Sequence, residues 1–408
     1  MDVFAMKDTW AETQGEGVTV AVVDSGVDAR HPDLTGQVLE GKDFTGGGNA
    51  QKDLDGHGTS MASLIAGHGH GSGEASGMLG LAPKAKILPL RVIETQKDPN
   101  HDETWAAAVR YAVDHGAKVI NLSFSNDGGK TLSDGRAAIA YAQAHDVVVV
   151  ASAGNDGSIA VDEPAALPGV VSVGAVNKEG NRWDGSNTGK GLTLMAPGVD
   201  ILAADMTRSQ QYSLSTGTSD STAYVSATAA LVRAKHPDLT AGQVINRLIK
   251  SASFLGHKGL KAPDEEYGYG IIRPYQAVTM DIPAGSKENP LGQLKSSTST
   301  SSEASKGTGT STEAKKEKSS SSNILVLAGG VAAVVVIGAI VIVVIRSRRN
   351  GGNGGPGSGG GVSSQGSGYP PAQQPYPNSA PAQGYPAPPG QSPQHPNPYT
   401  QQPPRQGQ

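Results

Sequence analysis

Runs of apolar, β-branched residues separated by helical patterns constrain the fold of this chain most. The first run, residues 18–23, is nearly unbroken and ends in Asp24-Ser25-Gly26. Such a run predicts a strand buried on both faces, as in a parallel sheet. Similar runs cover residues 87–92, 118–124, 147–152 and 170–175, and helical patterns lie between them at 60–68, 103–115 and 133–145. This alternation predicts an α/β fold with a doubly wound, mostly parallel sheet.

Two polar residues lie at positions where α/β folds commonly carry functional groups. Asp24 directly follows the first run, and functional groups lie beyond the carboxyl ends of strands in open α/β sheets. His57 lies between Gly56 and Gly58 at the entrance of a predicted helix, where glycines leave the imidazole uncrowded. His68 and His70 have a spacing that suggests metal ligands, but their glycine-rich surroundings offer no rigid face, so no metal site is predicted.

A hydroxyl and an amide complete the set of candidate residues. Gly217-Thr218-Ser219 runs into a helical pattern over residues 223–235. A serine at a helix start is exposed, and the unpaired N–H groups and helix dipole there favour the negative charge of a tetrahedral acyl intermediate. The alternative is that Ser219 is an ordinary N-cap. Asn155 follows the run at 147–151, and its amide is a good donor to an oxyanion, although a plain turn asparagine has the same sequence context.

Together these segments resemble the subtilisin-like serine peptidases, the subtilases. The chain order Asp24, His57, Ser219 is the subtilisin order. Further segments of the chain also match the family, so the resemblance covers about residues 10 to 280. These are His31-Pro32-Asp33-Leu34, Ser152-Ala153-Gly154-Asn155, residues 164–169, residues 196–199, and Tyr267-Gly268-Tyr269-Gly270 as the closing strand.

The resemblance implies a mechanism and a set of substrate-binding residues. Ser219 is expected to attack a peptide carbonyl, His57 to act as the base and Asp24 to orient it. The side chain of Asn155 and the backbone N–H of Ser219 are expected to form the oxyanion hole. An extended substrate is expected to lie along the strand Leu122, Ser123, Phe124 and Ser125, and its side chain beside the small residues Ala151, Ser152, Ala153 and Gly154. Structural calcium is common in the family, but no acidic loop in this chain predicts a site.

Departures from the family pattern leave a second hypothesis open. Asp220-Ser221-Thr222-Ala223 follows Ser219, where the family has a hydrophobic or small residue and, later, proline. Asp220 favours the helix start but would oppose an oxyanion if it faced the site. The alternative to an endopeptidase is therefore a catalytically weak scaffold of the same fold that binds a secretion complex.

The composition changes after the peptidase-like region, which we place at residues 1–282. Residues 283–322 have the Ser/Thr/Lys/Glu composition of a solvated linker. The uncharged apolar run 324–345 is long enough, at roughly 33 Å, to cross a bilayer; a buried core helix is the alternative. Residues 346–408 begin with three arginines and continue as a Gly/Pro/Gln-rich, disordered tail whose Tyr-Pro repeats are either polyproline-type ligands or plain disorder.

These regions predict a single-pass protein of the cell membrane. The arginines after residue 345 favour a cytoplasmic tail and hence an extracellular peptidase domain. Met1 is not followed by the apolar stretch of a signal peptide. A subtilase domain, polar stalk and membrane anchor resemble the mycosins, proteases attached to type VII secretion. The expected partners are thus a protein or peptide substrate, the membrane and a secretion complex. The net charge of −4 does not indicate a nucleic acid as a partner.

Overall fold

A seven-stranded parallel sheet forms the centre of the domain. The computed structural model describes residues 4–95, 101–126 and 129–294, except for the side chains of residues 101–103. The strand order is β2-β5-β1-β6-β7-β8-β9, and every neighbouring pair is parallel. The strands are β1 (Thr19–Asp24), β2 (Lys42–Asp43), β5 (Lys86–Arg91), β6 (Val119–Leu122), β7 (Val148–Ser152), β8 (Val171–Val176) and β9 (Leu194–Pro197). The predicted α/β fold with a mostly parallel sheet is confirmed.

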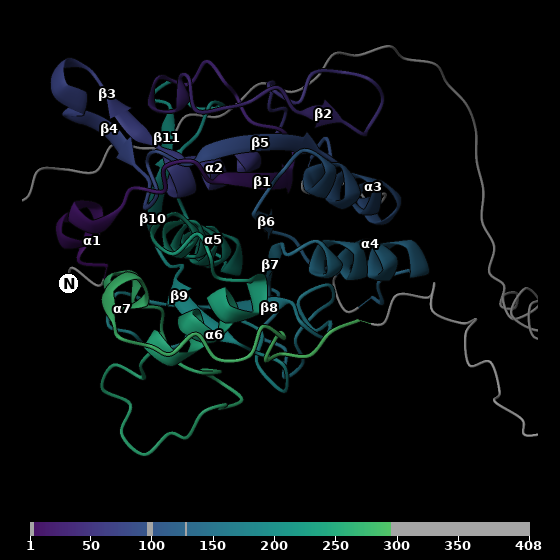
Figure 1. Cartoon of the computed structure of the whole chain (residues 1–408). Coiled ribbons are helices and arrows are strands. Elements are labelled where there is room, and N and C mark those ends of the chain that lie inside the picture. Colours follow the sequence, from purple (N-terminus) through teal and green to yellow (C-terminus); the bar gives the residue numbers. More distant parts are fainter. Residues whose placement is uncertain (1–3, 96–100, 127–128, 295–408) are drawn as a thin grey trace, which may run out of the picture. The chain divides into compact units, whose positions relative to one another are not determined.

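Helices cover both faces of this sheet (Figure 1). Helices α3 (His101–Asp114) and α4 (Ser133–Ala144) pack on one face, where Ala21 and Val23 of β1 point. Helices α2 (His57–Ala66) and α5 (Thr218–Lys235) pack on the other face, against Val20 and Val22. Successive residues of a strand point to opposite faces, so an unbroken apolar run supplies both cores.

Smaller elements surround the sheet. Two antiparallel hairpins are formed by β3 (His68–His70) with β4 (Ser76–Leu79) and by β10 (Ile201–Ala204) with β11 (Tyr212–Ser215). The remaining helices are α1 (Met6–Glu12), α6 (Ala241–Ser251), α7 (Pro274–Thr279) and the short 3-10 turns Pro32–Leu34 and Ser72–Glu74. Hairpin β10–β11 leads directly into α5 and therefore fixes how the chain enters that helix.

Three segments differ from the sequence-based expectation. Helix α5 begins at Thr218, five residues before the apolar pattern, and its N-cap is Gly217, so Ser219 is not an N-cap. Strand β6 ends at Leu122, so the residues after it continue as irregular chain. The expected closing strand at 267–270 is wrong: the bridges beside β9 fall on Ile271, which pairs with Met195 and Ser253.

The domain continues beyond residue 282. The side chain of Asn289 donates to Gly169 O at 2.8 Å, and Gly169 N donates to Leu291 O at 3.0 Å. Leu294 N donates to Gln143 Oε1 at 3.0 Å, which ties the chain to α4. The first part of the segment interpreted as a linker therefore lies on the peptidase-like domain.

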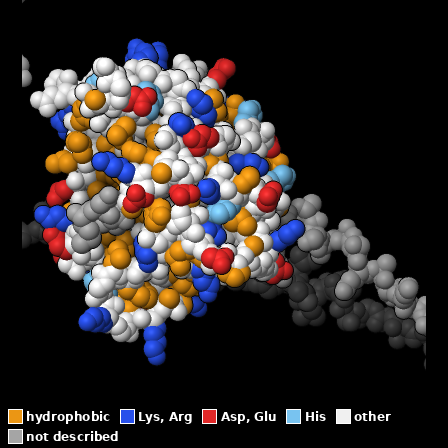
Figure 2. Space-filling view, turned by 60° about the vertical axis from the view of Figure 1, so that its left-hand side comes forward, with side chains coloured by type: hydrophobic (Ala, Val, Ile, Leu, Met, Phe, Trp, Pro, Cys, Tyr) orange, Lys and Arg blue, Asp and Glu red, His pale blue; other side chains and the backbone are white. Residues whose placement is uncertain are grey.

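The predicted membrane span at 324–345, the rest of the linker and the tail at 346–408 lie outside the described residues. Within the part of the chain that the structure describes, no helix has the length and apolar character needed to cross a bilayer. On the face drawn in Figure 2, lysine and arginine side chains are interspersed with aspartate and glutamate, and apolar side chains lie between them. That face therefore carries no extended patch of one charge.

Candidate active site

A carboxylate and an imidazole meet at the carboxyl edge of the sheet. Asp24 is the last residue of β1 and is only 1% exposed. His57 is the first residue of α2, and its Nδ1 lies 2.8 Å from Asp24 Oδ1 and 2.9 Å from Oδ2. A carboxylate acceptor places the Nδ1 proton on that side of the ring, which leaves Nε2 available to exchange a proton with another group.

Two glycines permit this close approach of α2 to β1. A Cβ atom on Gly58 would lie 2.0 Å from Gly26 O, much closer than any side-chain atom can come. Gly26 itself has a φ of 98°, a left-handed conformation that favours glycine, and its own Cβ position is 2.5 Å from Lys52 O. The glycines beside the two candidate residues thus bring His57 within reach of Asp24.

Asp53 fixes the turn that presents His57, and this role was not predicted from the sequence. Its Oδ1 accepts hydrogen bonds from Ser25 Oγ (2.8 Å), Asp55 N (3.0 Å) and Gly56 N (2.8 Å). Its Oδ2 accepts from Thr59 N (2.8 Å) and Thr59 Oγ1 (2.6 Å). Asp53 therefore ties the residue after Asp24 to the first turn of α2. Asp53 lies four residues before the helix, so the only sequence signal was its tendency to form an Asx turn.

Ser219 lies at the start of α5, beside the neighbouring strand β6. It is 9% exposed, and its Oγ donates to Ser123 O at 2.9 Å. Ser123 Oγ donates in return to Ser219 O at 3.1 Å. Ser123 directly follows β6, which pairs with β1, the strand that ends in Asp24. The hydroxyl is therefore bonded to the residue that follows the strand next to the one carrying the carboxylate, and neighbouring strands lie roughly 5 Å apart.

The hydroxyl of Ser219 is directed to a carbonyl in this structure. Among the described residues, its side-chain hydrogen bond goes to Ser123 O, and His57 Nε2 accepts none from it. A buried chain of polar groups supports Ser123: Asn121 Nδ2 donates to Ser123 Oγ at 2.9 Å, and Ser226 Oγ donates to Asn121 Oδ1 at 2.9 Å. The three candidate residues are gathered at one edge, with the serine in a rotamer that does not engage the imidazole.

The amide of Asn155 is oriented by the residue before Ser219. Asn155 Oδ1 accepts from Thr218 N and from Thr218 Oγ1, both at 2.9 Å. Ser152 Oγ lies 2.5 Å from Thr218 Oγ1 and holds that hydroxyl in place. Because the amide oxygen is occupied by these two donors, the exposed NH₂ group of Asn155 faces away from Thr218 and is free to donate to another acceptor.

The residues expected to bind substrate are mostly buried. Leu122 and Ala151 are fully buried at the ends of β6 and β7, and Phe124 packs with Trp105 at a centroid distance of 6.1 Å. Ser123, Ser152 and Ala153 are buried as well, while Ser125 is half-buried. Gly154 has a φ of 110°, and a Cβ atom there would lie 2.1 Å from Asn187 Nδ2. These segments therefore present mainly backbone groups at the edge of the site.

Three carboxylates act on the imidazole. Burial alone would lower the pKa of His57, but the charge and hydrogen bond of Asp24, together with the charges of Asp220 and Asp53, raise it to about 9. Burial raises the pKa of Asp220 to about 6, against the opposing effects of its hydrogen bond from Ser215 and the charge of His57. The three carboxylates therefore stabilise the protonated form of the ring.

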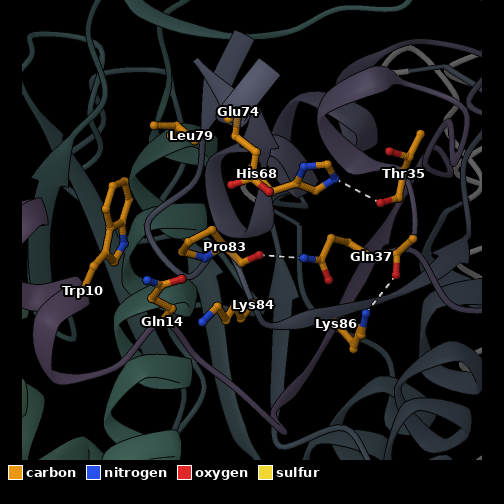
Figure 3. Close-up of a pocket in the computed structure, with 12 residues that line it drawn as sticks. Trp10, Gln14, Thr35, Gln37, His68, Glu74, Leu79, Pro83, Lys84 and Lys86 are labelled. Carbon is orange, nitrogen blue, oxygen red and sulfur yellow. Dashed lines mark hydrogen bonds between the residues drawn. The ribbon is translucent and has the colours of Figure 1, made fainter. Parts of the chain in front are cut away.

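A separate polar pocket of about 490 Å³ lies near the amino-terminal end of strand β5, away from the site of Asp24 and His57 (Figure 3). Trp10, Gln37, His68 and Lys86 are among the residues that line it. Lys86 is the first residue of β5, whereas Asp24 ends the paired strand β1, so the two sites are separated by the length of a strand. Within the described part of the chain, no group of three or more His, Asp or Glu residues is arranged to hold a metal ion.

The fold and this edge of the sheet define a class: an α/β protein that gathers a carboxylate, an imidazole and a hydroxyl at the carboxyl ends of its strands, which are the groups that a serine hydrolase requires. The sequence profile described as "Subtilase family" matches residues 15–270. The chain belongs to the subtilase family of serine endopeptidases.

Relatives and solved structures agree with this assignment. The thermophilic serine proteinase of Bacillus sp. (strain AK1) is 35% identical over 272 residues, which cover 66% of this chain and 64% of that protein. The crystal structure of MycP1 with its N-terminal propeptide removed has a TM-score of 0.61 at 30% identity and covers 70% of this chain and 98% of that one. The MycP3 protease from the type VII (ESX-3) secretion system has a TM-score of 0.57 at 32% identity, over 68% and 87% of the two chains. The predicted resemblance to mycosins is thus confirmed by the similarity of the structures. The chain spans less than two thirds of the length of the Bacillus proteinase.

Proposed function

We propose that this chain is a serine endopeptidase in which Asp24, His57 and Ser219 form the catalytic triad. The observation that carries the proposal is the contact of both Asp24 oxygens with His57 Nδ1, beside a serine at the first turn of α5. Asp24 holds the ring so that Nε2 serves as the base. Nε2 takes the Ser219 proton as Oγ attacks the peptide carbonyl, and then passes it to the leaving amine.

Asn155 and the backbone N–H of Ser219 are proposed to hold the oxyanion. The amide of Asn155 is preorganised by Thr218, since both hydrogen bonds to its oxygen come from that residue. The N–H of Ser219 belongs to the first turn of a helix, where it has no partner within the helix and the dipole favours negative charge. The acyl-enzyme that forms is then hydrolysed by water, which His57 activates in the same way.

The substrate is proposed to be an extended peptide that adds a strand beside residues 122–125. Leu122 and Phe124 are buried, so recognition there depends on their backbone N–H and C=O groups. The backbone of the small residues 151–154, at the end of β7, is proposed to border the place of one substrate side chain. No cofactor is needed for this reaction, because every proton is transferred by residues of the chain.

Chemical labelling of the full 408-residue chain tests the proposed triad. A fluorophosphonate probe should label wild type at Ser219 and should fail to label Ser219→Ala. Ser221→Ala is the matched control: its hydroxyl lies in the same helix turn but donates to Ala196 O, so labelling should persist. Folded wild-type protein that stays unlabelled between pH 6 and 10 would contradict the enzymatic function.

The chain is further proposed to be anchored in the cell membrane through residues 324–345, with its peptidase domain outside and its tail inside. The apolar run and the three arginines after it support this topology, and the similarity to MycP1 and MycP3 supports a role beside a type VII secretion complex. A reporter fused after Gln408 should be active inside the cell; a signal only outside would reverse the topology.

A catalytically weak scaffold is the second candidate function. The bond of Ser219 Oγ to Ser123 O favours it, because the hydroxyl is not engaged with the base. Ser219→Ala discriminates the two functions in a secreting cell. Loss of secretion or of substrate processing supports the enzyme, whereas an unchanged phenotype supports the scaffold.

A further inference from the structure

Asn187 is a fully buried polar residue in the chain between β8 and β9, and the proposed mechanism does not use it. Its backbone N–H donates to Gly154 O at 3.1 Å. Its side-chain Oδ1 accepts from Asp156 N at 3.1 Å and from Ser158 N at 2.9 Å. These contacts lie on both sides of Asn155, the proposed oxyanion donor. One buried asparagine therefore holds the backbone before and after that donor.

The loop held in this way is otherwise open to solvent. Residues 155–157 are exposed. A further backbone bond, from Gly157 N to Gly185 O at 2.9 Å, joins the loop to the chain two residues before Asn187. The loop thus rests on the segment that contains Asn187. Because the exposed residues bury no apolar surface of their own, loss of these bonds should loosen the loop without opening the hydrophobic core.

Asn187 is itself fixed to the sheet. Its Nδ2 donates to Asp162 Oδ2 at 3.1 Å, and the preceding residue, Ser186, accepts from Ala175 N of β8 through its Oγ at 3.0 Å. The amide packs directly on the backbone of Gly154, where a Cβ atom would lie 2.1 Å from Asn187 Nδ2. The position of the loop is therefore set by strand β8 through a buried side chain.

The amide of Asn155 is thereby oriented from two directions. Thr218 bonds its side-chain oxygen from the start of α5. Asn187 fixes the backbone that carries the side chain. An oxyanion donor acts only within about 2.7–3.1 Å of the developing charge, so both constraints are needed to aim the NH₂ group.

We propose that Asn187 is a positioning residue, which holds the backbone around Asn155 so that its NH₂ group points at the oxyanion. The inference rests on the proposed function, since it concerns the oxyanion hole of that reaction. Asn187 contacts neither the substrate nor the reacting atoms and acts through Asn155 alone.

A double-mutant cycle between Asn187→Ala and Asn155→Ala in the full chain tests this role. Asn187→Ala alone should lower kcat about ten- to a hundredfold with little effect on KM, because a misplacement of about 1 Å costs up to about a hundredfold. In a chain that already carries Asn155→Ala no amide is left to position, so Asn187→Ala should lower kcat further by less than about threefold. A further loss as large as in wild type would overturn the proposal, since Asn187 would then act through another group.

Asn177→Ala is the matched control. Asn177 Oδ1 also accepts from two backbone N–H groups in a turn, those of Glu179 at 3.1 Å and Asn181 at 3.0 Å. The substitution makes the same chemical change in a turn that does not carry Asn155, so kcat should stay at the wild-type value. Thermal melting verifies that each variant is folded. If Asn187→Ala does not melt cooperatively, Asn187→Ser, which keeps a small polar side chain, takes its place.

Amide hydrogen exchange separates this proposal from the proposed function, because it needs no substrate. The N–H groups of Asp156 and Ser158 should exchange about tenfold faster in the Asn187 variant than in wild type, as expected for the loss of one hydrogen bond each. Asn177→Ala should leave both rates unchanged. Faster exchange supports the hold of Asn187 on the loop even if wild type cleaves no peptide, in which case the enzymatic function alone fails. Unchanged exchange of both groups in the folded variant overturns the role of Asn187, whatever the activity.

Discussion

Replacing Asp53 by asparagine removes one negative oxygen from the turn that presents His57. Five donors converge on the carboxylate of Asp53: three on Oδ1 and two, both from Thr59, on Oδ2. The asparagine oxygen can serve the three donors on one side. Its NH₂ group then faces Thr59 N–H, which is left buried without an acceptor because both groups are donors.

The magnitude follows from these bonds. A hydrogen bond to a charged group contributes about 1.5–3 kcal/mol, and a buried donor left unsatisfied costs about 1–3 kcal/mol. Asp53 is 3% exposed, so water cannot replace the lost acceptor. The free energy of unfolding should fall by about 3 kcal/mol, and Tm by about 6–12 °C for a domain of this size. Because the turn also positions His57, kcat/KM should drop about tenfold or more.

Thermal melting and urea unfolding of the full chain measure the first effect, and hydrolysis of a peptide library measures the second. Asp238→Asn is the matched control, because it makes the same chemical change at an exposed position after α5 and should shift Tm by less than about 2 °C. A Tm shift of Asp53→Asn within that same range would mean that the five bonds do not stabilise the turn.

Three further changes test other parts of the site and fold. Asn155→Ala should lower kcat about a hundred- to a thousandfold with little effect on KM, measured by steady-state kinetics; a loss confined to KM would contradict an oxyanion role. Gly58→Ala should fail to fold or lose several kcal/mol, because its Cβ would lie 2.0 Å from Gly26 O, whereas Gly46→Ala, with no atom within 4 Å, should melt like wild type. Burial would raise the pKa of Asp43, but Arg91 and the donors of the adjoining loop lower it to about 2. Its stabilising effect of about 2 kcal/mol is therefore present above pH 4, and urea unfolding should show the gap between wild type and Asp43→Asn closing as the pH falls from about 4 to 2.

The sequence was sufficient to predict the sheet because its signal is local. Each central strand is a run of β-branched residues buried on both faces, and the predicted starts and ends differ from the observed ones by one or two residues for most strands. Helix α5 was harder. Its first turn, Thr218 to Thr222, lacks both apolar periodicity and good helix formers, and it is helical because the whole turn is buried by tertiary packing.

The contacts within the site could not be predicted from the sequence, because they join residues that lie far apart in the chain. Glycine-flanked His57 and the serine turn were visible as local patterns, and the structure brings His57 into contact with Asp24, which is 33 positions away in the sequence. The hydrogen bond between Ser219 and Ser123 joins residues 96 positions apart, and the sequence around neither residue indicates it. Likewise, the sequence showed the charge of Asp220 but not its direction, which depends on Ser215 in the preceding hairpin.

The carboxylates at this edge of the sheet favour the charged ring that forms in the intermediate of the proposed reaction. His57 lies at the N-terminus of α2, where the helix dipole disfavours a positive ring, yet three carboxylates outweigh the dipole and burial and raise its pKa to about 9. Once the serine has attacked, the ring must be an imidazolium, and the negative oxygen lies at the start of α5, where N–H groups stabilise it. The carboxylates therefore lower the energy of the charged pair that develops in the transition state.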